Sequence, residues 1–113
     1  MSGGLPNSAL AWVEKKKIVQ YLLSPTHAEG GPKAQFFVGR GFTVSNWEEM
    51  ADALCHHARS NDISRAKTTP FAVNYSLDCN VPTPDRSNPC IRTVWEIRPE
   101  DPRPRLITAH PLG

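Results

Sequence analysis

The chain has 113 residues, 39% of them hydrophobic, and a chain of this length forms one domain around a single core. Its 13 basic and 11 acidic residues leave a net charge of +2, which gives no support to a general electrostatic attraction to nucleic acid or to an anionic membrane. The 11 prolines exclude a long helical bundle or coiled coil and predict many loops.

The N-terminal part of the chain predicts an arm and a short helix. Residues 1–12 are rich in Gly, Ser, Pro and Asn and predict a loose arm, followed by a single domain over residues 13–113. Apolar residues at helical spacing predict an amphipathic helix over 14–23. This helix ends at Ser24 because the residue before a proline, here Pro25, avoids the helical conformation.

Two further helices are predicted. A Gly-rich loop leads to a short helix over 32–38, which glycines terminate. The clearest helix covers about 46–60, and Ser45 and Glu48 at its start form the S-x-x-E pattern of a capping box. Its apolar stripe consists of Trp47, Met50, Ala51, Leu54, Cys55 and Ala58.

The second half of the chain predicts strands, because apolar and polar residues alternate there. Clear alternation covers 71–78 and 91–98, a third strand is expected at 104–110 and a weaker one at 63–68. Residues 80–89 carry prolines and predict a wide hairpin connection. Helices followed by antiparallel strands predict an α+β domain, with two or three N-terminal helices packed on a sheet of three or four strands.

The sequence also suggests a cellular compartment. Its apolar runs are too short to span a bilayer, and the segment from Met1 to Pro6 lacks the features of a signal peptide. We therefore expect a soluble, cytoplasmic protein with no membrane partner. The three cysteines include no CxxC pair, which agrees with a reducing compartment. A disulfide between Cys79 and Cys90 remains open, since these residues bracket the proline-rich loop.

No strong catalytic signature is present. The sequence contains no P-loop, GxGxxG, HExxH or GxSxG motif, and we expect neither a cofactor nor a metal. Cys55, His56 and His57 are adjacent, but neighbouring residues on a helix point about 100° apart and do not converge on one ion. His56 is expected in solvent, opposite the apolar stripe.

The loop from His27 to Lys33 is a candidate site. It offers an imidazole, a carboxylate and an ammonium group beside a helix N-terminus, which attracts anions. In metal-free RNA cleavage, a histidine can move protons while a lysine or arginine stabilises the charged phosphorane. A solvent-exposed helix connection is the commoner explanation of such a loop.

The polar face of the predicted sheet offers a second candidate. It would present Asn74, Arg92, Glu96 and Arg98. The last strand adds either Thr108 and His110 or Arg105, depending on which side faces inward. One interpretation is a concave anion-binding floor beneath the loop that carries His27 and Lys33. The other is a surface ion pair between Arg92 and Glu96, which contributes little.

Three stretches of the chain together resemble a known family. They are Ile18–His27 with Gly31–Phe37, then Gly41-Phe42, and finally Arg92–Trp95 with Pro104–Pro111. Their order resembles a small uncharacterised bacterial domain family, which occurs as short stand-alone proteins and is similar to C-terminal domains of polymorphic toxins. The resemblance covers about residues 15–112.

The resemblance implies the helix-then-sheet fold of small barnase/RelE-like ribonuclease toxins. It nominates His27, Lys33, Arg92, Arg105 and Thr108 as site residues. The sequence departs from the pattern where relatives tend to carry Gly and Lys before the strand tyrosine, because Phe71-Ala72-Val73-Asn74 precedes Tyr75 here. It also has His110 where relatives tend to carry an aromatic or aliphatic residue.

Two functions remain open from the sequence. The first is metal-independent RNA cleavage, with RNA as partner, in which catalysis depends on His27, Lys33 and Arg92 and substrate binding on Arg105, Thr108 and His110. The alternative is a non-catalytic protein-interaction module, for example a homodimer, that binds its partner through a sheet edge or the region of Trp95. The nearly balanced charge favours the second function, and the resemblance favours the first.

Overall fold

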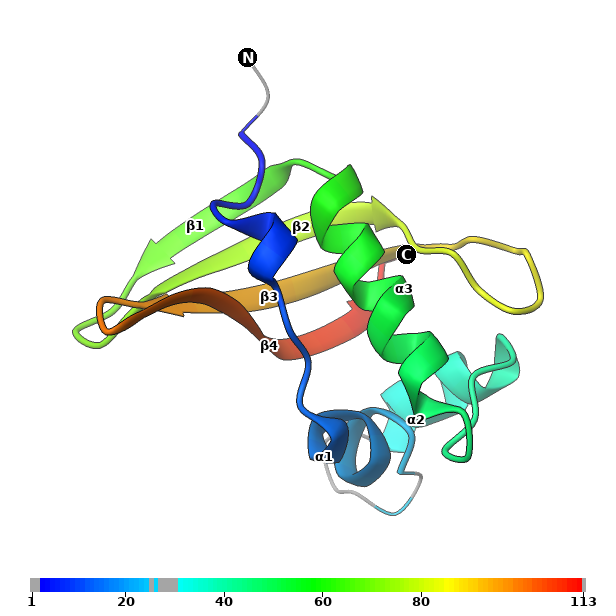
Figure 1. Ribbon diagram of the computed structural model, residues 1–113. Coiled ribbons are helices and arrows are strands. Elements are labelled where there is room, and N and C mark those ends of the chain that lie inside the picture. The colour runs from blue at the N-terminus through cyan, green and yellow to red at the C-terminus, as the bar shows by residue number, and fades with distance from the viewer. Residues whose placement is uncertain (1–2, 25, 27–30, 113) are drawn as a thin grey trace.

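The computed structural model describes residues 3–24, 26 and 31–112. In these residues three α-helices and two shorter helical segments precede a four-stranded sheet, and Figure 1 shows their arrangement. The predicted α+β fold is therefore confirmed. None of the helices in these ranges has the length and apolar character needed to cross a bilayer. The elements are η1 (Ser8–Leu10), α1 (Lys15–Lys17), η2 (Ile18–Leu22), α2 (Gly31–Gly39), α3 (Trp47–Ser60), β1 (Ile63–Thr68), β2 (Val73–Asn80), β3 (Cys90–Arg98) and β4 (Asp101–Pro111).

The four strands form an antiparallel meander in the order β1-β2-β3-β4. In the centre of the sheet Trp95 of β3 pairs with Tyr75 of β2 and Leu106 of β4. Successive side chains of a strand point to opposite faces, so this register places these three residues on one face. The predicted strand at 63–68 is confirmed as β1.

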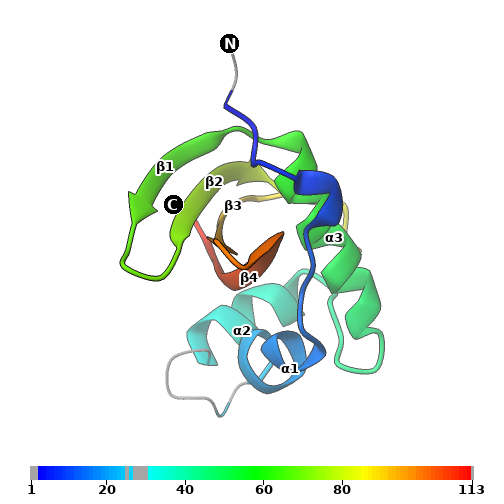
Figure 2. The same ribbon diagram turned by 60° about the vertical axis from the view of Figure 1, so that its left-hand side comes forward.

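The α3 helix crosses that face of the sheet and closes the core (Figure 1). Met50 and Leu54 of α3 are buried in the same cluster as Leu77 of β2 and Ile91 and Trp95 of β3. The remaining helices, α1, η2 and α2, lie together beside β4 (Figure 2). The face of the sheet that α3 covers is therefore the core face, and the opposite face is available for polar groups.

The start of α3 differs from the predicted capping box. The helix begins after Asn46, and Ser45 is not its N-cap. The side chain of Asn46 donates to Glu49 at 3.2 Å, and its backbone N–H donates to Thr43 Oγ1 at 3.2 Å. The predicted pairing of Ser45 with Glu48 is therefore wrong, because the chain enters the helix one residue later than the pattern indicates.

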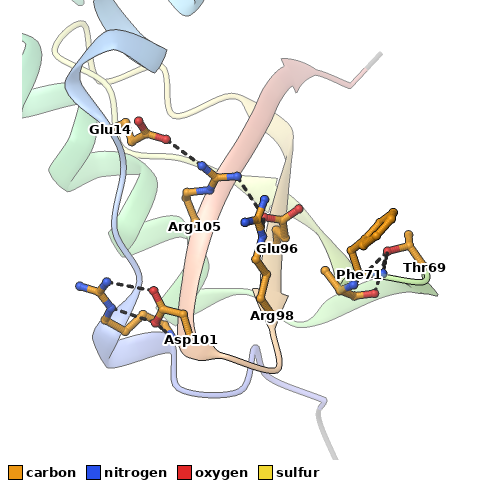
Figure 3. Close-up of polar contacts among 9 residues, drawn as sticks. Glu14, Thr69, Phe71, Glu96, Arg98, Asp101 and Arg105 are labelled. Atoms are coloured by element: carbon orange, nitrogen blue, oxygen red, sulfur yellow. Dashed lines mark hydrogen bonds and ion pairs between the residues drawn. The ribbon is translucent and has the colours of Figure 1, made fainter.

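The turn between β1 and β2 removes Phe71 from the predicted strand. Thr69 Oγ1 accepts hydrogen bonds from the backbone N–H groups of Phe71 at 3.2 Å and Ala72 at 3.0 Å. These bonds hold a tight turn that ends the strand alternation, and Figure 3 shows Phe71 in it. Phe71 is 78% exposed, so the predicted strand over 71–78 begins too early, and β2 starts at Val73.

The predicted loose arm also needs correction over residues 3–12. Gly3 O accepts from Ile63 N at 2.7 Å, and the side chain of Leu5 is only 4% exposed. Trp12 N donates to Pro104 O at 3.0 Å, and Trp12 O accepts from Leu106 N at 3.2 Å. The segment is held because the outer edges of β1 and β4 offer backbone groups that need partners.

Candidate functional site

Polar side chains gather on the face of the sheet that points away from α3, which we call the open face. In β3, Ile91, Thr93 and Trp95 are buried, and the residues between them are half-buried. In β4, buried Ala109 lies between half-buried Thr108 and His110. The open face comprises Asn74, Ser76, Asp78, Arg92, Val94, Glu96, Thr108 and His110.

Three of these residues form a line across the sheet. The register pairs Arg92 with Asp78 on one side and with His110 on the other. Thr108 lies two residues before His110 on β4, so their side chains share a face. Facing side chains of paired strands lie about 5 Å apart at Cβ, so Asp78, Arg92 and His110 form the line. Thr108 faces Val94 and is therefore a diagonal neighbour of Arg92.

The carboxylate of Asp78 fixes the orientation of Arg92. Arg92 Nε donates to Asp78 Oδ1 at 2.7 Å, and Nη2 donates to Oδ2 at 2.8 Å. This hydrogen bonding is the main cause that lowers the pKa of Asp78 and raises that of Arg92. A guanidinium has five N–H donors, so three of them remain for an anion. The predicted pair of Arg92 with Glu96 is wrong, because Asp78 lies directly opposite Arg92.

Lys33 reaches the same face from α2. Its Nζ donates to Tyr21 Oη at 2.5 Å and to Thr108 Oγ1 at 3.0 Å, and these two oxygens are 3.2 Å apart. In the described part of the chain, no carboxylate oxygen lies within ion-pair distance of Lys33. A half-buried ammonium that contacts neutral oxygens retains its attraction for an anion.

The hydrogen bond of His110 determines which ring nitrogen can accept a proton. His110 Nδ1 lies 3.2 Å from the carbonyl oxygen of Pro111. A carbonyl oxygen only accepts, so Nδ1 carries the hydrogen and Nε2 holds the lone pair of the neutral ring. The lone pair of the neutral ring therefore lies on Nε2, and the strand register pairs His110 with Arg92.

Arg105 is on the open side of the sheet as well, but it forms a separate ion-pair cluster. The β3–β4 register shifts between Val94 and Trp95, so Arg105 and Thr108 lie on the same side although their numbers predict opposite sides. Arg105 donates to Glu14 and to Glu96, each at 3.0 Å (Figure 3). The sequence predicted that either Arg105 or the pair Thr108 and His110 lies on the polar face, and the structure places all three residues there.

A depression connects the two clusters. Its volume is about 390 Å³, and it extends from Arg105 to Tyr21. Lys16 and Lys17 also line it, together with Glu14 and Gln20. The basic side chains along this depression continue the positive character of the Lys33 cluster, while Glu14 is already engaged by Arg105.

The structure brings together four of the predicted site residues, namely Lys33, Arg92, Thr108 and His110. Arg105 lines the far end of the depression, and His27 lies outside the described residues. Sequence reasoning missed Tyr21 and Asp78 as site residues. Asp78 could have been predicted from the sequence, because strand alternation places it on the polar face of β2. Tyr21 could not, since its contact with Thr108 spans 87 residues.

A buried hydrogen-bond chain beneath the site was also missed. Trp95 Nε1 donates to Thr93 Oγ1 at 2.8 Å, Thr93 Oγ1 lies 3.1 Å from His57 Nδ1, and His57 Nε2 donates to Cys79 O at 2.9 Å. Trp95 and His57 have no exposed surface. The side chain of Trp95 itself is therefore not accessible to a partner, and binding through its region stays a prediction. The spacing of His57 from buried Met50 and Leu54 was the available signal.

Comparison with known proteins gives one match. A family model described as a domain of unknown function, DUF6883, matches residues 4–113. No curated protein and no solved structure matches the chain. The family description names no activity, so the resemblance to toxin domains stays a prediction.

Proposed function

The chain belongs to the DUF6883 family, and we propose that its open face binds RNA and cleaves it by metal-independent phosphodiester transfer. The observation that carries this proposal is the grouping of Lys33, Thr108, His110 and Arg92 on one face of the sheet. These residues come from α2, β3 and β4, so folding alone brings them together. The group combines two cations with an imidazole, and such groups can stabilise a phosphorane and transfer protons without a metal.

The proposed reaction is a transfer within the RNA strand. The 2′-oxygen attacks the adjacent phosphorus and loses its proton to a base, while the bond from phosphorus to the 5′-oxygen breaks and an acid protonates that oxygen. The products are a 2′,3′-cyclic phosphate and a 5′-hydroxyl. Proton transfer is assigned to His27 and His110, and Nε2 of His110 has the lone pair for it. Lys33 and Arg92 stabilise the negative charge that develops on the phosphorane.

The supporting argument for binding comes from the charges. Arg92 is oriented by Asp78 and retains three N–H donors, and Lys33 contacts only neutral oxygens in the described part of the chain. Arg105, Lys16 and Lys17 border the neighbouring depression, where a second phosphate of the same strand would find a cation. A local cluster of this kind attracts a phosphate even though the net charge is only +2.

The test is a cleavage assay in the presence of a metal chelator, with total RNA as substrate and the cyclic phosphate end as the product measured. We expect Lys33→Ala and His110→Ala each to reduce the rate by about 10²–10⁴-fold, the usual contribution of such groups. The matched controls are Lys15→Ala and His56→Ala, because both side chains are exposed and neither lines the open face or the depression. The controls are expected to cleave at the wild-type rate.

Two further measurements make the assay decisive. Circular dichroism melting of each variant separates lost chemistry from lost folding. His110→Ala is the variant least expected to unfold the chain, because the half-buried His110 lies near the end of β4. His27→Ala, with growth scored on induction, tests the predicted acid or base. Wild-type protein that releases no cyclic phosphate, or variants that all cleave at one rate, would show that the ribonuclease proposal is wrong.

The alternative, a non-catalytic interaction module, is favoured by one observation. Phe71 is 78% exposed in the β1–β2 turn, next to an edge strand, and an exposed aromatic ring of this kind is typical of a contact with another protein. In this alternative the partner is a second copy of the chain. An inactive wild type that elutes as a dimer in gel filtration would favour it over the ribonuclease.

A further inference from the structure

Cys79 and Cys90 lie at the base of the loop that joins β2 to β3. The register pairs Cys79 with Ile91 and Asn80 with Cys90, so the two cysteines are diagonal neighbours. Cys90 Sγ donates to Cys79 Sγ, and the two sulfur atoms are 2.7 Å apart. Both are free thiols. The sulfur atoms of a disulfide bond are about 2.05 Å apart, so a small side-chain rotation would bring these two sulfur atoms to bonding distance.

The backbone around the two thiols is held on several sides. Val81 N donates to Pro89 O at 3.0 Å and closes the base of the loop, and Leu112 N donates to Cys90 O at 3.1 Å. Cys79 O accepts from buried His57 at 2.9 Å. When the backbone already holds two thiols together, little further conformational entropy is lost as they form a cross-link.

The backbone conformation of Cys79 is one that residues with a side chain rarely adopt. Its φ is 142°, in the region that favours glycine, although the residue carries a side chain. Such a conformation persists only where the surroundings fix it, and it is concentrated at functional sites. Here it turns the end of β2 so that the thiol of Cys79 meets that of Cys90.

The two thiols differ in a way that sets the order of reaction. Cys79 is exposed and Cys90 is half-buried. Cys90 donates its proton to Cys79, and this hydrogen bond is the main cause that raises the pKa of Cys90 to about 11. Cys90 therefore keeps its proton, and an oxidant in solution meets Cys79 first. The third cysteine, Cys55, donates to Ala11 O at 3.5 Å.

We propose that Cys79 and Cys90 form a reversible intramolecular disulfide when the chain meets a low-molecular-weight disulfide such as oxidised glutathione. The thiolate of Cys79 attacks one glutathione sulfur, forms a mixed disulfide and releases one glutathione thiolate. Cys90 then loses its proton, its sulfur attacks Cys79 Sγ, and the second glutathione thiolate leaves. The two cysteines lose two electrons and two protons, and glutathione disulfide gains them as two molecules of glutathione.

The disulfide would fix the loop to the helices. Asp85 N donates to Arg40 O at 3.2 Å, and Pro84 lies against Gly41, so the closed loop packs on the link between α2 and α3. Closing this loop restricts the unfolded chain and raises the melting temperature. Because Asp78 precedes Cys79, oxidation also stiffens the end of β2 that orients Arg92.

The test is titration of the full-length protein with mixtures of reduced and oxidised glutathione, followed by blocking of free thiols with N-ethylmaleimide and mass spectrometry. We expect oxidised protein to carry one blocked cysteine, Cys55, and a cross-linked peptide pair that contains Cys79 and Cys90. Its melting temperature should exceed that of the reduced protein, and dithiothreitol should reverse both changes.

Three variants complete the design. Cys90→Ser should trap glutathione on Cys79 as a stable mixed disulfide, because the second attack is missing. Cys79→Ser should leave Cys90 largely unmodified, and Cys55→Ser is the control that still forms the cross-link. Protein that keeps all three thiols open to blocking in oxidised glutathione, or that cross-links only between molecules, would overturn the proposal. The thiol and mass measurements are independent of RNA cleavage, since neither cysteine is among the residues proposed to bind or cleave RNA.

Discussion

Gly41 shows how one residue connects two parts of the fold. It lies in the link between α2 and α3 with a φ of 102°, a conformation that glycine adopts without strain. Pro84 of the β2–β3 loop lies against it, so that a Cβ on residue 41 would be 2.8 Å from Pro84 Cβ. The sequence predicted glycine here as a helix terminator, and the structure adds a close approach of the loop.

At this residue scale we predict that Gly41→Ala lowers the free energy of unfolding by about 1–3 kcal/mol, through backbone strain and displacement of Pro84. Gly39→Ala is the matched control. Gly39 lies at the end of α2 with no atom within 4 Å of a new Cβ, so alanine there should leave stability unchanged or raise it by up to about 1 kcal/mol. Urea denaturation measures both. Equal effects of the two variants would contradict the role of Pro84.

At the scale of elements, His57 joins α3 to β2 and β3. Its Nε2–H donates to Cys79 O, so its Nδ1 accepts, and the hydroxyl of Thr93 donates to it. Burial is the main cause that lowers the pKa of His57. The neutral ring therefore holds one helix and two strands in a fixed arrangement, directly beneath Arg92 and the open face.

This arrangement makes stability depend on pH. A histidine in the unfolded chain has a pKa of about 6.5, and His57 in the folded protein has a lower one. Above about pH 6.5 both states are neutral at this residue, but below it only the unfolded state takes up the proton, so stability falls as pH falls. We predict a loss of up to about 1 kcal/mol between pH 6.5 and pH 5.5, measured by urea denaturation.

His57→Gln should remove this pH dependence, because Gln keeps a donor for Cys79 O but does not titrate. His56→Gln is the control and should retain it, since His56 is exposed on the same helix. Asp85 and Asp101 have pKa values lowered to about 2 by hydrogen bonds, from Thr83 and from Arg103 respectively, so their contribution is lost only at more acidic pH. A slope that survives His57→Gln would assign the effect to another group.

At the scale of the whole molecule, the N-terminal segment connects both edges of the sheet. Gly4 pairs with Asp62 before β1, and Trp12 pairs with Arg105 in β4. Between these contacts Leu5 enters the core, while Leu10 of the same segment is 53% exposed. The segment thus covers the start of β1 and part of the edge of β4.

Substitution of two leucines in the N-terminal segment, one buried and one exposed, tests whether packing of this segment stabilises the fold. We predict that Leu5→Ala lowers the free energy of unfolding by about 2–4 kcal/mol, the usual cost of emptying a buried leucine site. Leu10→Ala should change it by less than about 0.5 kcal/mol, as expected for an exposed position. Thermal denaturation of both variants gives the comparison. A Leu5→Ala variant as stable as wild type would support the loose arm that the sequence predicts.

The sequence by itself determined the α+β class, the position of α3 and the four strands, because these depend on the periodicity of neighbouring residues. It also nominated Lys33, Arg92, Thr108 and His110, since their chemistry is visible without a fold. Only the tertiary structure decided their partners. The contact of Lys33 with Thr108 spans 75 residues, and no local pattern specifies it.

The same distinction explains the errors. A register shift between β3 and β4 places Arg105 and Thr108 on one side of the sheet, and a hydroxyl of Thr69 turns Phe71 into solvent. Each depends on hydrogen bonds that the alternation of apolar and polar residues does not determine. The burial of His57 and of Leu5 likewise follows from which surfaces meet. Local periodicity therefore sets the elements, and long-range packing sets the site that they form.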